Sequence, residues 1–347
     1  MNKKFIGDKL RASLSNLNSL PAMPAIAQKL LALPLNTEEG EAQLLKLIEQ
    51  DLQLFARIIG LANASSMGVG RKVTGIQDAA QLLGMKRMKS VAIGIATMSQ
   101  MVNNPAGKHF DPHDLWTHCM SIALVMNTIA QVMPRQIRPD DNQIFLAGLL
   151  HDIGLMALHY LDPDTSDELH RQLRLQPKTS ITQIELDLLG MTHGDIGALL
   201  VKQWHLPEEI IEVVKLHHAL DIASVSRNNP LIRIANIAEK LVPDFGIAEH
   251  TIEPVEDGEW AELCIDRYRA VEISELANEL AIQIVQLPEA PRFVEPVSQD
   301  QQAVTTVSTA PVATGSSANM PSDPVRSPFP FKWLFEWLRR LFSRRSP

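Results

Sequence analysis

Residues 145–154 of the chain read FLAGLLHDIG, and this stretch says more about the fold than any other. It places His151 and Asp152 side by side within an otherwise apolar run. An imidazole and a carboxylate are costly to bury unless a partner satisfies them. A metal ion is one such partner, and further candidate ligands lie on both sides of the pair along the chain. The pair therefore directs attention to a metal site inside an apolar core.

The hydrophobic periodicity around this stretch is helical along most of the chain. Residues 28–33, 42–48 and 54–61 place apolar side chains at positions i, i+3 and i+4, and no segment alternates convincingly as a strand does. Proline-rich or polar breaks, for example at residues 20–24 and 65–75, keep the expected helices short. These patterns predict an all-α fold, a compact array of short helices.

Two helix starts bear directly on the candidate ligands. Asp111 and Pro112 open the segment that carries His118, and proline suits the first helical position because its missing N–H is not needed there. Asn229 and Pro230 open a second helix in the same way. We expect that helix to carry a further ligand position.

Composition and charge narrow the classes of protein to which the chain can belong. The chain has 347 residues, enough for one large or two ordinary domains, and a net charge of −8, which argues against nucleic acid as a partner. Only Cys119 and Cys264 are present, so a disulfide framework is not expected. No secretory signal is recognised, and no uninterrupted apolar run approaches the ~20 residues of a spanning helix. We therefore expect a cytoplasmic protein.

The C-terminal part differs in character from the rest. Residues 289–328 are predicted to be a disordered linker, and residues 329–345 a basic amphipathic helix. Residues 329–347 hold five basic residues against one glutamate, a net of +4, which leaves −12 for residues 1–328. A helix with aromatic side chains on one face and arginines on the other suits an anionic membrane interface. Docking on the body or on a partner is the alternative. The predicted membrane contacts are Phe331, Trp333, Leu334, Trp337, Leu338, Arg339, Arg340, Leu341, Phe342, Arg344 and Arg345.

The candidate metal ligands are imidazoles, one carboxylate and one amide from several predicted helices. They are His118, His151, Asp152, His193, His217, His218 and Asn236. Each alone is readily explained as a structural residue, but a metal site needs imidazole and carboxylate ligands that converge from several elements. Because neighbouring helical side chains diverge by ~100°, His151 and Asp152 could serve two metal positions.

Other polar residues receive simpler interpretations. Glu185 and Asp187 are expected to be surface charges, and Lys86, Arg87 and Lys89 a solvated helix face or a contact for an acidic partner. The remaining histidines fit no ligand scheme and are expected at the surface: His109, His113, His159, His170, His205 and His250.

Several short motifs together resemble the HDOD domain family, a helical branch of the HD phosphohydrolase superfamily found in bacterial signalling proteins. The motifs occur in the family's order over about residues 15–245. They are LPAMP at 20–24, LLG at 82–84, LWTH at 115–118, GLLHDIG at 148–154, WHLP at 204–207 and HH at 217–218. The resemblance implies an HDOD-type helical array with an N-terminal subdomain at residues 1–102 and an HD-like subdomain at 103–245. Further helices are expected at 246–288.

The resemblance also implies how the ligand set is used. In catalytic relatives the last metal ligand is an aspartate, and that position falls on Asn236 here. An amide offers a neutral oxygen where a hard cation prefers a carboxylate. Leu155 stands where HD-GYP enzymes carry a phosphate-contacting lysine, and no Gly-Tyr-Pro sequence is present. These departures predict a degenerate site.

The expected function is therefore a non-catalytic signal-transduction protein that acts through protein partners, gated by a ligand or by a divalent metal such as Fe, Mn or Zn. The resemblance points to partners in two-component, chemotaxis or cyclic-dinucleotide (cyclic di-GMP) pathways. The C-terminal helix would hold the protein peripherally at the inner membrane. The alternative is a metal-dependent phosphohydrolase that cleaves a cyclic dinucleotide with the His/Asp cluster.

Overall fold

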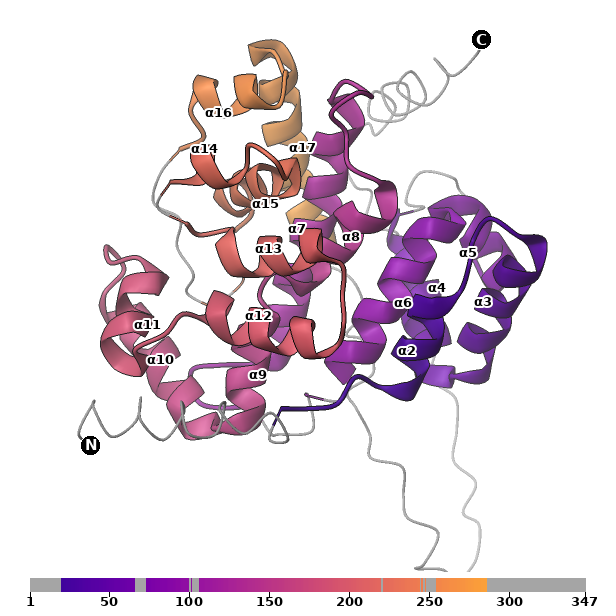
Figure 1. Cartoon of the computed structure of the whole chain (residues 1–347), viewed down its shortest axis with the longest axis horizontal. Helices are drawn as coiled ribbons and strands as arrows, with labels where there is room; N and C mark the ends of the chain where they lie inside the picture. Colours follow the sequence, from indigo (N-terminus) through magenta and orange to yellow (C-terminus); the bar gives the residue numbers. More distant parts are fainter. Residues whose placement is uncertain are drawn as a thin grey trace, which may run out of the picture. The chain divides into compact units, whose positions relative to one another are not determined.

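The computed structural model of the chain describes residues 20–65, 73–99, 101, 106–219, 221–243, 245, 247 and 254–285. Within these residues every regular element is a helix, which confirms the predicted all-α fold (Figure 1). The predicted linker at 289–328, the predicted helix at 329–345 and its membrane contacts lie outside the described residues, so they stay predictions.

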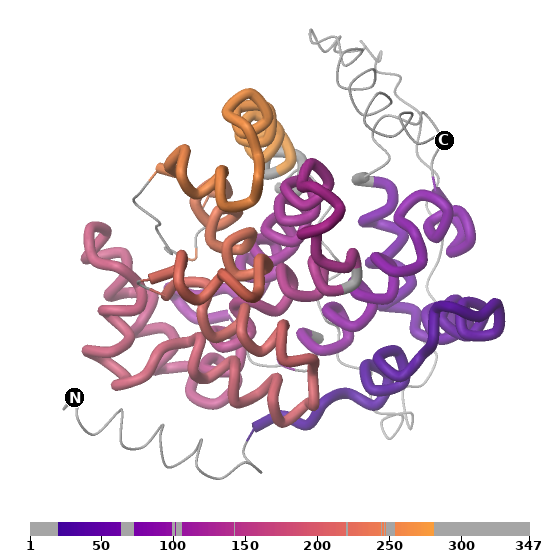
Figure 2. Tube along the Cα trace, turned by 45° about the horizontal axis from the view of Figure 1, so that its top comes forward, coloured from indigo at the N-terminus to yellow at the C-terminus, as the bar shows by residue number. Residues whose placement is uncertain are grey.

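The N-terminal helices form a layer against the rest of the array. They are α2 (Ala25–Ala32), α3 (Glu38–Gln50), α4 (Leu52–Ser65), α5 (Ile76–Leu83) and α6 (Met85–Ser99). The helix α2 packs on α6, and α6 in turn packs along α8 (Figure 2). The helix α3 begins where Thr37 Oγ1 accepts a hydrogen bond from the Gly40 N–H at 3.1 Å.

The helices that carry the candidate ligands follow. They are α7 (Pro112–Val132), α8 (Asp141–Leu150), α9 (Ile153–Leu161), α10 (Pro163–Leu175), α11 (Ile181–Leu189), α12 (His193–Gln203), α13 (Glu208–Leu216), α14 (Ile222–Val225) and α15 (Pro230–Leu241). Both predicted starts are confirmed: Asp111 and Asn229 cap α7 and α15, and a proline takes the first position of each helix. Two more helices, α16 (Asp257–Glu262) and α17 (Arg267–Val285), follow α15, and α17 packs on α7.

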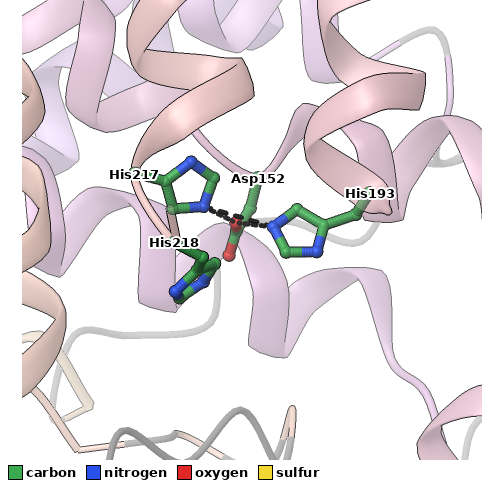
Figure 3. A group of neighbouring side chains, drawn as sticks. All are labelled: Asp152, His193, His217 and His218. Carbon is green, nitrogen blue, oxygen red and sulfur yellow. Dashed lines mark hydrogen bonds and ion pairs between the residues drawn. The ribbon is translucent and has the colours of Figure 1, made fainter. Parts of the chain in front are cut away.

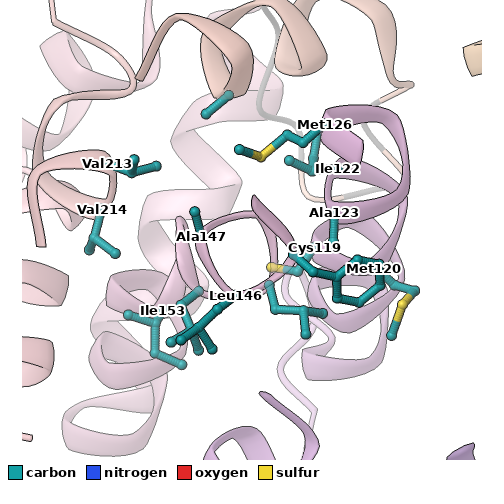
Figure 4. Close-up of a cluster of buried hydrophobic side chains, with 14 of the residues drawn as sticks. Cys119, Met120, Ile122, Ala123, Met126, Leu146, Ala147, Ile153, Val213 and Val214 are labelled. Atoms are coloured by element: carbon teal, nitrogen blue, oxygen red, sulfur yellow. The ribbon is translucent and has the colours of Figure 1, made fainter. Parts of the chain in front are cut away.

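The core lies where α7 crosses α8. Side chains of α7, α8, α9 and α13 interlock there, among them Cys119, Ala147 and Val213 (Figure 4). A Cβ atom on Gly148 would lie 2.5 Å from the Cα atom of Ala123, so only glycine allows these two helices to approach so closely. Cys119 is fully buried, as its place beside His118 in an apolar helix suggested.

A buried hydrogen bond ties the N-terminal segment to the ligand-bearing helices. The indole N–H of Trp204, at the end of α12, donates to the Pro21 carbonyl oxygen at 2.9 Å. The expected subdomains at 1–102, 103–245 and 246–288 therefore touch one another, through this bond and through the contacts of α6 with α8 and of α17 with α7. Their boundaries stay predictions.

Two helical stretches, Pro112–Val132 and Gln143–Leu161, are long and apolar enough to cross a membrane by length and composition. Polar residues interrupt both stretches, so neither is an uninterrupted apolar run. Of their most apolar windows, 67% and 89% respectively are buried inside the protein, as in the core helices of a soluble protein.

Candidate metal centre

Two groups of buried polar side chains meet where α7, α8, α9, α12, α13 and α15 converge. Within each group the possible ligand atoms all lie within 4.8 Å of one another. The first group comprises His118, His151, Asp152 and Glu239, and the second comprises Asp152, His193, His217 and His218. The structure therefore brings together six of the seven predicted ligands, and that they bind metal stays a prediction.

Most of these side chains are positioned by helix ends. His151 directly follows α8, Asp152 precedes α9, and His193 is the first residue of α12. His217 ends α13, and Glu239 lies in the last turn of α15. His118 is the exception, because it lies within α7.

Asp152 joins the two groups. Its Oδ2 atom lies 3.2 Å from His151 Nε2 and 3.4 Å from His118 Nε2. Its Oδ1 atom lies 3.2 Å from His217 Nε2 and 3.4 Å from His193 Nε2 (Figure 3). One carboxylate thus offers one oxygen to each group. The pair therefore reaches two ligand groups, as the sequence suggested, but His151 faces only the first whereas Asp152 faces both.

Asp152 is the residue before α9, but its side chain does not cap that helix. An aspartate at the N-cap commonly accepts a hydrogen bond from a backbone N–H of the first turn. Asp152 makes no such bond, and neither of its buried oxygens accepts a hydrogen bond of good geometry from the described residues. Buried polar atoms without hydrogen bonds are costly, and a metal ion would satisfy both oxygens.

Glu239, and not Asn236, faces the imidazoles of the first group. Glu239 Oε1 lies 2.6 Å from His151 Nε2 and 3.2 Å from His118 Nε2. The Asn236 amide instead donates to the His217 carbonyl oxygen at 3.1 Å, and its Oδ1 atom accepts from Arg233 at 3.5 Å. The family resemblance placed Asn236 at the last position of a degenerate ligand set, but the structure places Glu239 beside the imidazoles and Asn236 outside both groups. That Glu239 binds metal is a prediction. One helical turn further along α15, a carboxylate completes the first group.

The backbone and one carboxylate fix the orientation of three imidazoles. The Nδ1–H groups of His151 and His217 donate to the carbonyl oxygens of Gly148 at 2.8 Å and Val213 at 2.9 Å. His193 Nδ1 lies 2.8 Å from Glu185 Oε1. In all three rings Nε2 faces Asp152 or Glu239, and a ring whose only proton is on Nδ1 would offer the Nε2 lone pair to a metal ion.

A close contact between α9 and α12 sets the position of His193. A Cβ atom on Gly154 would lie 1.9 Å from the His193 carbonyl oxygen and 2.9 Å from the Gly197 nitrogen. The starts of the two helices are therefore in backbone contact, which brings His193 up to Asp152. A capping box of Thr192 and Asp195 begins α12 at the same place.

The electrostatics of the two groups differ. Burial lowers the pKa of His118, but the carboxylates of Glu239 and Asp152 outweigh burial and raise it to about 10. Burial acts against ionisation of Glu239, yet His118 and His151 hold its pKa well below its usual range. Burial and the neighbouring imidazoles lower the pKa of His217 to about 4. The first group is thus an ion-pair cluster, and the second offers mainly neutral nitrogen donors.

Several polar residues lie elsewhere than the sequence predicted. Glu185 is fully buried beside His193, so its interpretation as a surface charge is wrong, whereas Asp187 is exposed as expected. His159 and His170 are also buried, in ring contact with Phe110. In the basic cluster, Lys86 is exposed, as a solvated face predicts, and pairs with Asp140, whereas Arg87 and Lys89 are partly buried. Arg87 donates to Asn127, and Lys89 donates to the carbonyl oxygens of Leu31 and Leu33 at the end of α2.

The donor set fits a pair of divalent metal ions. Two imidazoles and two carboxylates make up the first group, and three imidazoles and the shared carboxylate the second. Imidazole and carboxylate ligands suit Zn²⁺, Fe²⁺ and Mn²⁺. The two Asp152 oxygens without hydrogen bonds are donor atoms that such ions could bind.

Comparisons with known proteins agree with this architecture. A solved structure of a candidate signal transduction protein from Marinobacter aquaeolei VT8 is 25% identical, covers 82% of this chain and 65% of its own, and has a TM-score of 0.63. An HDOD domain protein of unknown function from Geobacter sulfurreducens is 20% identical, covering 80% of this chain and 97% of its own, with a TM-score of 0.64. A candidate metal-dependent phosphohydrolase from Shewanella amazonensis SB2B is 18% identical over 81% of this chain and 99% of its own, with a TM-score of 0.55.

Among curated proteins, an uncharacterized protein of Treponema pallidum (strain Nichols) is 24% identical over 242 residues. The match covers 67% of this chain, which spans only 44% of that relative. The HDOD domain itself matches residues 20–220, more than half of the chain, and this range includes every residue of the two groups except Glu239. The chain belongs to the HDOD domain family.

Proposed function

We propose that this protein is a signalling protein whose two ligand groups bind a pair of divalent metal ions, and whose metal-loaded helical body binds a protein partner. The observation that carries the proposal is the carboxylate of Asp152, buried without hydrogen bonds between two sets of imidazoles. The family and the signal-transduction relative support a regulatory role. By family resemblance, the partner would belong to a two-component, chemotaxis or cyclic-dinucleotide pathway.

Two features favour regulation over rapid catalysis. The ligands of the first group are at most 3% exposed, and in the second only His218 is half-buried, which leaves little room for a bulky substrate to approach. Leu155 is fully buried where a phosphate-contacting cation would be useful. Arg233, the cation nearest to Asn236, is paired with Glu259 and Glu262.

Metal analysis of the full chain tests the proposal. The protein would be stripped with a chelator, reloaded with Mn²⁺, Fe²⁺ or Zn²⁺ separately, and desalted before metal and protein are quantified. We expect two ions per chain, a higher melting temperature when loaded, and loss of both effects in Asp152→Asn. A wild-type chain that retains no ion from any of the three solutions contradicts the proposal.

A second candidate function, hydrolysis of a phosphodiester, is favoured by Glu239. This side chain restores the anionic ligand whose apparent loss argued against catalysis. A metal pair would supply a bound water of lowered pKa and stabilise charge on the phosphoryl oxygens. Turnover of cyclic di-GMP or another cyclic dinucleotide by metal-loaded protein, abolished in His151→Ala and Glu239→Gln, would establish this function. Full metal occupancy without turnover would leave the regulatory role.

We also propose that residues 329–345 hold the protein at an anionic membrane surface, on the charge and amphipathic pattern of that segment. The test compares the full chain with a chain lacking residues 329–347 in co-sedimentation with phosphatidylglycerol vesicles. We expect only the full chain to sediment, and less of it as salt is raised. Equal sedimentation of the two chains would refute the assignment to this segment.

A further inference from the structure

Glu185 is a buried carboxylate that the ligand set itself does not use. It lies on α11 and is fully buried, although the next two residues, Leu186 and Asp187, are exposed. Its Oε1 atom lies 2.8 Å from Nδ1 of His193, and its buried Oε2 atom accepts no hydrogen bond from the described residues. A buried carboxylate with a single hydrogen-bond partner is expensive, so its place beside His193 calls for a reason.

The two groups differ in negative charge. The first contains the carboxylates of Asp152 and Glu239, whereas the second has only the shared carboxylate of Asp152 among its ligands. A dication held by three neutral imidazoles and half of a shared carboxylate is poorly compensated in a buried place. Glu185 is not among these ligands, but its carboxylate contacts the Nδ1 atom of His193 and so adds negative charge beside the group.

We infer that Glu185 is a positioning residue of the second group, which holds His193 with Nε2 toward Asp152 and supplies negative charge that raises the affinity of this group for its metal ion. Carboxylates that accept the second N–H of a ligand histidine fix its tautomer and increase its basicity. The inference rests on the proposed function, since it concerns the same pair of ions. It assigns to Glu185 an effect on one ion and not on the other.

The connection through α11 has a further consequence. The helix α11 packs chiefly on α10 and contacts α12 little apart from the bond between Glu185 and His193. Its N-terminus is fixed by Ser180, whose hydroxyl accepts from the Gln183 N–H, and its end by Gly190 at φ 73°. The bond from His193 to Glu185 thus links the second group to α11, so metal at that group should steady His193 and, through this bond, α11.

Three variants of the full chain test the inference. Glu185→Gln removes the charge but keeps an oxygen that can accept from Nδ1, and Glu185→Ala removes both. Asp187→Asn is the matched control, because it removes an exposed charge two residues away on the same helix. The probes are Mn²⁺ and Zn²⁺ alone, with ions bound per chain and chelator competition as readouts. The melting temperature of each metal-free variant shows whether it is folded.

We expect Glu185→Ala to weaken one of the two ions by about 10–100-fold. Glu185→Gln should weaken the same ion by less, and the other ion should change by less than about 3-fold in either variant. His217→Ala should weaken that same ion, because His217 belongs only to the second group. In ¹⁵N-histidine spectra of Zn²⁺-loaded protein, the His193 Nδ1 proton should shift in Glu185→Gln and not in Asp187→Asn.

Two ions bound with wild-type affinity in a folded Glu185→Gln chain, together with an unshifted His193 proton, overturn the inference alone. Equal weakening of both ions overturns the assignment of Glu185 to the second group. If Glu185→Ala fails to fold, the Gln variant decides the matter. A wild-type chain that binds no metal overturns the proposed function and this inference with it.

Discussion

Replacing Gly154 by alanine should damage the second ligand group more than the fold. The new Cβ atom would start 1.9 Å from the His193 carbonyl oxygen, and real contacts of this kind stay above 3.0 Å. The starts of α9 and α12 must therefore separate by about 1 Å or more, because the obstacle is backbone and cannot rotate away. His193 and Asp152, now 3.4 Å apart, sit on the two segments that would separate.

The magnitudes follow from the two effects of the added methyl group. Overpacking costs about 1–3 kcal/mol, and alanine regains about 0.5–1 kcal/mol over glycine within a helix. A net loss of about 1–2 kcal/mol lowers the melting temperature by about 2–8 °C for a domain of this size. Ligand distances in metal sites tolerate only about 0.2 Å, so we expect one ion per chain in place of two.

Gly60→Ala is the control, because Gly60 is exposed on α4 and a Cβ atom there meets nothing within 4 Å. This variant should melt at or slightly above the wild-type temperature and keep two ions. The assay is thermal melting of metal-free and metal-loaded protein, with ions counted after desalting. If Gly154→Ala binds two ions as tightly as Gly60→Ala does, the claim that this close contact sets the site is refuted.

Three further predictions concern single residues. Glu239→Gln should weaken binding of the ion at the first group, which metal titration measures. Asn236→Asp should not increase metal affinity. It should cost about 1–3 kcal/mol of stability in denaturant unfolding, because the new side chain cannot donate to the buried His217 carbonyl. Burial lowers the pKa of His170 to about 4, so the unfolded chain takes up a proton that the folded chain refuses, and stability should fall by about 1.4 kcal/mol per pH unit from about pH 6.5 toward 4. Urea unfolding of His170→Gln should lack that part of the slope, and an unchanged slope would contradict the assignment. Trp204→Phe should cost about 1–3 kcal/mol by leaving the buried Pro21 carbonyl unpaired, and a melting temperature equal to that of the wild type would show the bond to be unimportant.

Local signals were enough to predict the helical fold. Periodicity at i, i+3 and i+4 reports which side of a helix is apolar. The starts of α7 and α15 are set locally by a capping Asp111 or Asn229 followed by a proline at the first helical position. What periodicity does not report is how closely two helices approach. Gly148 and Gly154 carry that information, but only the structure shows which backbone each of them meets.

The candidate metal ligands illustrate what a sequence pattern does not report, which is the direction in which each side chain points. Asn236 and Glu239 lie three residues apart on one face of α15, so spacing alone does not tell which of them faces the imidazoles. A signal was available: Glu239 is an acid on the apolar face of α15. Glu185 carries the same signal, since Ile181, Ile184 and Leu188 mark the buried face of α11 and Glu185 lies within it.

Metal binding at this place has a consequence for any partner of the helical body. The ligands come from six helices, so ions that bind only the folded chain stabilise the arrangement of those helices, by about 2.7 kcal/mol at a hundredfold excess over the dissociation constant. If metal loading strengthens partner binding by some factor, linkage requires the partner to strengthen metal binding by the same factor. A partner whose presence leaves the metal affinity unchanged is therefore one whose binding the metal does not control. The proposed gating is therefore tested by two measurements that must agree: the factor by which metal strengthens partner binding, and the factor by which the partner strengthens metal binding.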